Sequence, residues 1–122
     1  MMGKNTGVKR LYYASCYSMK GIRAAYTNEP AFRYEVYVSA VLIPLACVVA
    51  QNAYQFAALV GVCLIVLAME LINTAVEAIV DRAGTEFHAL AGIAKDTGSA
   101  AVLMVLLMAG LVWGAVLWEN YV

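Results

Sequence analysis

The sequence predicts an all-α integral membrane protein, in which an N-terminal amphipathic surface helix precedes a bundle of three transmembrane helices. Of the 122 residues, 64% are hydrophobic and 13% are charged, a balance outside the range of soluble domains. Three largely apolar stretches, about 30–50, 56–82 and 97–118, are long enough to cross a bilayer core about 30 Å thick. Because no linker or internal repeat separates them, we expect residues 1–122 to form a single membrane domain.

The first element, expected over residues about 6–27, has the pattern of a basic amphipathic helix. Apolar and aromatic residues such as Leu11 and Tyr17 interleave with basic residues such as Arg10 and Lys20. This pattern is typical of a helix that lies on the membrane surface, with its apolar face toward the lipid.

The second element is the first membrane span, over about 30–50. Asn28 or Glu29 followed by Pro30 predicts a helix cap and a first turn, so a new helix begins there. Residues 36–50 carry no charge. We expect the preceding turns to extend the span toward the membrane interface through aromatic and snorkelling side chains.

The second and third spans complete the bundle. The second, about 56–82, is apolar in its first half and polar on one face later, and Gly84 predicts its end. The third, about 97–118, is apolar apart from Ser99, and residues 96–99 predict its N-terminal cap. Trp118 suits an aromatic belt at the far interface.

The distribution of basic residues predicts the orientation in the membrane. Six of the eight precede the apolar part of the first span, the other two flank the 81–97 loop, and the 51–55 loop has none. The positive-inside rule then puts the N-terminus and the 81–97 loop in the cytoplasm, with the 51–55 loop and the C-terminus outside. The net charge of +0 gives no basic field for nucleic acid.

A stripe of polar residues runs along the second span. At about 100° per residue, Glu70, Asn73, Glu77 and Asp81 fall within an arc of about 80° on one helix face. A charge inside a span costs about 2.5–3.5 kcal/mol on insertion scales, so the set of carboxylates indicates a function. The alternative is that these residues only hold helices together by hydrogen bonds, and for Asn73 alone this reading is favoured.

The two glutamates of the stripe are expected to have separate roles. Glu70 and Glu77 lie about 10.5 Å apart along a straight helix, too far for both to hold one ion easily. Glu77, with Glu29 at the start of the first span, would suit Mg²⁺, which prefers carboxylate and phosphate oxygens. Glu70 could act as a general base on a lipid hydroxyl, and Asn73 could orient that carboxylate or a phosphoryl oxygen.

The segment between the second and third spans suits phosphate contacts. Lys95, near the expected helix start, could pair with phosphates, or could serve only as an anchor at the membrane interface. His88 taken alone is more often structural. The chain contains no GxxxxGK[ST], no GxGxxG and no protein-kinase motif. A nucleotide site here would therefore belong to none of the common classes.

Two segments resemble a known family. The segment MELINTAVEAIVDRAGTEFHALAGIAKDTGSAAV resembles the signature of the prokaryotic diacylglycerol kinase family, and GIRAAYTNEPAFRYE resembles its surface helix and first-span start. The likeness runs from about Thr6 to Trp118. It implies a homotrimeric kinase of the bacterial inner membrane, with the outer loop and C-terminus in the periplasm. Such an enzyme transfers the γ-phosphate of MgATP to the hydroxyl of diacylglycerol, giving phosphatidic acid.

The resemblance also implies roles for individual residues. Glu70 corresponds to the family's general base, Asn73 to a catalytic polar group, and Glu29 and Glu77 to its Mg²⁺ ligands. The positions that correspond to ATP contacts are Arg10, Tyr17, Glu29, Glu77, Glu86, His88, Lys95 and Asp96. The positions that correspond to lipid contacts are Glu70, Arg23, Ser99 and Trp113.

Some residues depart from the family pattern. Met19, Tyr34 and Ile93 stand where close relatives often carry Trp, Gln and Arg, and Pro30 replaces a small residue. Undecaprenol kinases share the E-x-x-N-T-A-x-E core, while EAIVDRAGTE and KDTGSAAV favour diacylglycerol. An ion-coupled small transporter subunit is the alternative from another class. The position of the acids near one interface counts against it.

Overall fold

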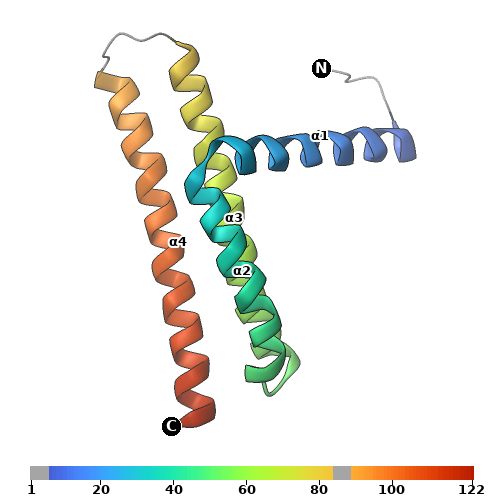
Figure 1. Cartoon of the computed structure of the whole chain (residues 1–122), viewed down its shortest axis with the longest axis vertical. Helices are drawn as coiled ribbons and strands as arrows, with labels where there is room; N and C mark the ends of the chain where they lie inside the picture. The colour runs from blue at the N-terminus through green and yellow to red at the C-terminus, as the bar shows by residue number, and fades with distance from the viewer. Residues whose placement is uncertain (1–5, 84–88) are drawn as a thin grey trace.

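The computed structural model describes residues 6–83 and 89–122, and these form four helices (Figure 1). They are α1 (Gly7–Asn28), α2 (Pro30–Val49), α3 (Ala53–Arg82) and α4 (Ala89–Tyr121). The last three are long and apolar enough to cross a membrane. They run along the long axis of the molecule, while α1 projects sideways from them (Figure 1). The predicted plan of a separate N-terminal helix followed by three spans is confirmed.

A sharp elbow joins α1 to α2 through a single residue, Glu29. The backbone N–H of Glu29 donates to the Ala25 carbonyl at 2.8 Å, which closes α1. Pro30 then opens α2 at its first position, where its missing N–H costs nothing. Glu29 therefore occupies the predicted cap position, but its carboxylate makes no capping hydrogen bond.

Polar contacts from α2 hold this elbow. Arg33 Nη1 donates to the carbonyls of Tyr26 and Thr27, at 2.9 and 3.0 Å. This contact satisfies carbonyls that the last turn of α1 leaves free and places a cation at the negative end of that helix. The hydroxyls of Tyr26 and Tyr37 share a hydrogen bond of 2.8 Å.

A network of amide side chains ties the three long helices together at the opposite end, which we call the amide end (Gln51, Asn52, Gln55 and Asn120). Asn52 caps α3 by accepting from the backbone N–H of Gln55 at 2.9 Å. Because of this cap, α3 begins three residues before the predicted start of the second span. Asn120 Nδ2 donates to the Val49 carbonyl and to Gln55 Oε1, both at 2.9 Å.

The start of α4 differs from the prediction. The helix begins at Ala89 in the described part of the chain, so the expected caps at residues 96–99 lie inside it. Thr97 Oγ1 does not cap the helix but donates back to the Ile93 carbonyl at 2.8 Å, a contact typical of a helix interior. Lys95 thus lies within the helix rather than at its start. The predicted terminator Gly84 lies outside the described residues.

Packing centres on α3, which contacts both α2 and α4. The buried cluster lies toward the amide end and consists of Ala46, Val49, Leu59, Val62, Trp113 and Val116. Large apolar side chains elsewhere are exposed in the single chain, for example Leu107 and Leu111 on α4. Such surfaces are stable only against lipid or another protein chain.

Candidate active site

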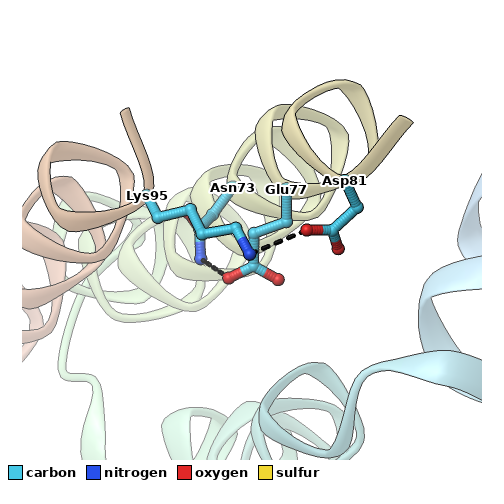
Figure 2. Close-up of polar contacts among 4 residues, drawn as sticks. All are labelled: Asn73, Glu77, Asp81 and Lys95. Atoms are coloured by element: carbon cyan, nitrogen blue, oxygen red, sulfur yellow. Dashed lines mark hydrogen bonds and ion pairs between the residues drawn. The ribbon is translucent and has the colours of Figure 1, made fainter. Parts of the chain in front are cut away.

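The polar stripe predicted on the second span lies on α3, and α4 packs beside it. Asn73 Nδ2 donates to Glu77 Oε1 at 3.4 Å, one turn further along. Lys95 Nζ on α4 forms an ion pair with Asp81 Oδ1 at 2.7 Å. Figure 2 shows the Lys95 side chain extending from α4 across the stripe, with its ammonium group close to Glu77 and Asp81. The structure therefore brings together a basic residue and the acids it was predicted to accompany.

Glu29 and Glu77 come together within one chain. Glu29 stands at the elbow, and its carboxylate lies against that of Glu77. Burial raises the pKa of the Glu29 carboxyl, and the neighbouring Glu77 and Asp81 carboxylates raise it further. Two like charges held this close would be relieved by a cation between them.

This pair fits Mg²⁺ rather than an ion that needs a complete set of protein ligands. Within residues 6–83 and 89–122, no group of three or more His, Cys, Asp or Glu side chains converges as a metal site. Mg²⁺ is usually held by one or two carboxylates, with water and phosphate oxygens completing the shell. The chemistry of the donors, all oxygen, agrees with this ion. The residues that would hold it are Glu29 and Glu77.

Glu70 is the most enclosed acid of the stripe, with 7% of its surface exposed. It lies close enough to Glu29, Glu77 and Glu35 for their charges to act on it. Its carboxylate has no hydrogen-bond or ion-pair partner among the described residues, whereas its backbone carbonyl accepts from Thr74 Oγ1 at 2.8 Å. A buried acid without a partner is available to exchange a proton with a ligand.

Glu35 of α2 was not among the residues predicted from the sequence, although it lies close enough to Glu70 for their charges to interact. In the sequence it falls in the turns that are expected to extend the first span toward the membrane interface. The signal that could have found it is the same one that marked the stripe: a carboxylate in a membrane helix costs insertion free energy. The acids near the site therefore come from α2 as well as from α3 and the elbow.

A groove lies between α1 and α3 beside the stripe and has a volume of about 430 Å³. Its lining is almost entirely apolar and consists of Ser18, Gly21, Ile22, Ala24, Ala25, Leu71, Thr74, Ala75 and Ala78. Leu71 and Thr74 flank the stripe residues Glu70 and Asn73 in sequence, so the groove opens next to the acids. Small residues at helical spacing on both segments were the available sequence signal for it.

The remaining predicted residues are scattered. Arg10, Tyr17 and Arg23 are exposed on α1, and the N-terminal part of that helix points away from the others (Figure 1). Asp96 and Ser99 are exposed on α4, while Glu86 and His88 lie outside the described residues.

Trp113 is not near the stripe. It belongs to the buried cluster toward the amide end, with 9% of its surface exposed. On α4, Gly98 lies against Asn73 of the stripe, and Trp113 follows it by 15 residues, which corresponds to about 22 Å at a rise of 1.5 Å per residue. The structure therefore assigns Trp113 a packing role in the single chain.

Comparison with known proteins identifies the family of this chain. The sequence profile of the family described as prokaryotic diacylglycerol kinase matches residues 16–117. A diacylglycerol kinase of Haemophilus influenzae is 43% identical over 117 residues, which cover 96% of this chain and 99% of that protein. One of Escherichia coli K12 is 40% identical over 121 residues, 99% of each chain. One of Pseudomonas aeruginosa is 42% identical over 112 residues, which cover 92% of this chain and 91% of that protein. With matches of this length and identity, the chain belongs to the prokaryotic diacylglycerol kinase family.

Proposed function

We propose that this protein is a membrane-bound diacylglycerol kinase that transfers the γ-phosphate of ATP to the lipid hydroxyl, giving phosphatidic acid. The observation that carries the proposal is that Glu29 and Glu77 meet beside an apolar groove in a chain with three membrane-spanning helices, with Glu70 close enough for their charges to act on it. Relatives that cover nearly the whole chain are named diacylglycerol kinases. The groove offers a place for an acyl chain next to the acids.

In this proposal the acids divide the work. Glu29 and Glu77 would hold Mg²⁺ beside the phosphates of ATP. When bound, that ion neutralises the negative charge of the phosphates during transfer. Glu70, buried and without a partner in the described chain, accepts the proton of the lipid hydroxyl. Asn73 keeps Glu77 in place through its hydrogen bond.

The basic residue of the site needs a change of partner. Lys95 is proposed to contact the phosphates of ATP, whereas it pairs with Asp81 in this structure. The two side chains are 46% and 66% exposed, and exposed ion pairs contribute little free energy, so ATP can displace the carboxylate. The pair keeps the ammonium group over the stripe until ATP binds.

Other contacts complete the proposal. We expect Arg10, Tyr17, Glu86, His88 and Asp96 to contact ATP. Arg23 and Ser99, which are exposed on α1 and α4, would contact the lipid. The buried position of Trp113 gives no support to a direct lipid contact.

The assembly and the orientation are also part of the proposal. The exposed apolar side chains of the long helices fit a homotrimer surrounded by lipid. The basic residues of α1 and of the segment 81–97 fit the cytoplasmic side, with the segment 51–55 and the C-terminus in the periplasm. ATP would then reach the acids from the cytoplasm, and the lipid would enter from the bilayer.

The test is phosphate transfer from labelled ATP to lipid in mixed micelles, with and without Mg²⁺, comparing diacylglycerol with undecaprenol. Mg²⁺-dependent labelling of diacylglycerol is the expected result. Labelling of undecaprenol alone would keep the mechanism and overturn the substrate. No labelling of either lipid, together with proton-coupled uptake in proteoliposomes, would favour the transporter.

A further inference from the structure

One glycine of α4 lies against the stripe. A Cβ added at Gly98 would overlap Asn73 Oδ1 and would lie 3.4 Å from Asn73 Cγ. At the other glycines in the described part of the chain, an added Cβ would meet no atom within 4 Å. These glycines are Gly7, Gly21, Gly61, Gly92, Gly110 and Gly114. At Gly98 alone among them, the backbone of one helix comes into direct contact with a polar side chain of another.

The contact determines which way the Asn73 amide points. Asn73 Oδ1 is buried against α4 and has no hydrogen-bond partner in the described chain, while Nδ2 donates to Glu77 Oε1 at 3.4 Å. The opposite orientation would turn Oδ1 toward Glu77 and bring two acceptors together, which repel each other. The amide therefore has one favourable orientation as long as α4 leaves room for its oxygen.

We propose that Gly98 is a positioning residue of the kinase site. Because it has no side chain, the Asn73 amide can lie against α4 and direct its N–H at the Glu77 carboxylate, which is then held in the orientation that binds Mg²⁺. Gly98 touches neither substrate nor ion and acts only through Asn73. This inference rests on the proposed function, in which Glu77 holds Mg²⁺.

A methyl group at position 98 would collide with one atom, Asn73 Oδ1. In Gly98→Ala the new Cβ overlaps Asn73 Oδ1, so either the amide turns away from Glu77 or α4 moves away from α3. Groups that orient a metal ligand typically change metal affinity 10- to 100-fold when they are lost. We expect the Mg²⁺ concentration for half-maximal activity to rise about tenfold, with a smaller change in the rate at saturating Mg²⁺.

The experiment is a double-mutant cycle on the full-length protein in detergent. Mg²⁺ is titrated in the presence of ATP for wild type, Gly98→Ala, Asn73→Ala and the double variant. Two readouts are followed: phosphate transfer to diacylglycerol and the rise in melting temperature on Mg²⁺ binding, which needs no turnover. Gly61→Ala on α3 is the matched control, because its added Cβ meets nothing within 4 Å.

The expected result is a weaker Mg²⁺ response in Gly98→Ala, and no further weakening when Gly98→Ala is added to Asn73→Ala, since the atom that the methyl group meets is then absent. Gly61→Ala should behave as wild type. The inference is overturned if Gly98→Ala keeps the wild-type Mg²⁺ response while its melting temperature falls, which would be a packing role alone. Additive effects in the double variant would overturn it as well.

Failure of the proposed function would look different. In that case the wild-type protein itself would transfer no phosphate to diacylglycerol, whatever residue stands at 98. The melting-temperature titration would still compare Mg²⁺ binding between wild type and Gly98→Ala. Equal responses there would overturn the positioning role independently of catalysis.

Discussion

The two ends of the helix bundle both carry polar side chains, but they use them in opposite ways. At the amide end, Gln55 and Asn120 exchange hydrogen bonds in both directions at 2.9 and 3.0 Å. Gln55 also accepts from the backbone N–H of Gln51, and Asn120 also donates to the carbonyl of Val49 at the end of α2. At the stripe, Asn73 Oδ1 is buried without a partner and the carboxylates of Glu29 and Glu77 lie together.

The difference separates structure from function. Polar groups inside a membrane protein are stable when they satisfy one another, as at the amide end. Groups that stay unsatisfied or repel one another lower stability and are retained where a ligand completes them. Changes at the amide end should therefore affect stability and leave catalysis intact. Changes at the stripe should impair catalysis without lowering stability.

The largest effect is expected at Glu70. Glu70→Gln removes the proposed proton acceptor while keeping the size of the side chain, so phosphate transfer to diacylglycerol should fall by about 10²- to 10⁴-fold, the range of general-base contributions. The melting temperature and its rise on adding MgATP should stay close to wild type. Near-normal turnover in this variant would remove Glu70 from the role of base.

The next effect concerns the acid pair. Glu77→Gln removes one of the two proposed Mg²⁺ ligands and one of two neighbouring negative charges. The Mg²⁺ concentration for half-maximal transfer should rise at least about tenfold, while the protein without Mg²⁺ should become more stable because the repulsion with Glu29 is gone. Thermal unfolding with and without Mg²⁺ measures both.

The matched control is Glu119→Gln, which changes an exposed acid near the C-terminal end of α4, far along the bundle from Glu77. Lower stability without Mg²⁺ would contradict the repulsion argument.

At the amide end the expected effect is on stability. Asn120→Ala removes the bonds to the Val49 carbonyl and to Gln55, and it should lower the free energy of unfolding by about 1–2 kcal/mol. Activity per folded molecule and the Mg²⁺ response should not change. Chemical denaturation in detergent micelles measures the first and the lipid assay the second. A changed Mg²⁺ response with normal stability would show that the two ends are coupled, and it would end the separation proposed here.

The smallest effect is expected at the elbow. There the hydroxyls of Tyr26 and Tyr37 are hydrogen-bonded to each other, unlike the carboxylates at the same end of the bundle. The hydrogen bond to Tyr37 raises the pKa of the Tyr26 phenol. Tyr37→Phe should move that pKa back toward its usual value and leave turnover nearly unchanged. Spectrophotometric titration of tyrosine ionisation follows the shift, with Tyr12→Phe as control. An unchanged titration of the remaining tyrosines would mean that the hydroxyls are not paired.

Much of the architecture follows from hydropathy and periodicity. Membrane helices must satisfy their own backbone groups, so long apolar stretches become helices almost wherever they occur. The first span was predicted at about 30–50 and α2 is Pro30–Val49. The stripe was predicted from spacing alone, because a helix brings residues three and four apart onto one face. The resemblance to the family was confirmed by the comparisons.

The helix ends were harder to predict than the spans. The cap expected at residues 96–99 was wrong because α4 already runs from Ala89. The Thr97 hydroxyl instead donates a hydrogen bond to the Ile93 carbonyl within the helix. A cap motif in the sequence competes with helix continuation, and local sequence does not decide between them.

The sequence by itself determined that this chain spans a membrane, where its helices run, and which acids share a face of α3, because these depend on hydropathy and on the repeat of a single helix. Only the tertiary structure decided that Glu29 meets Glu77 in the same chain, that the charge of Glu35 reaches Glu70, and that Gly98 lies against Asn73. Each of these contacts joins two helices, and the distance between helices depends on the packing of all side chains between them rather than on any local pattern.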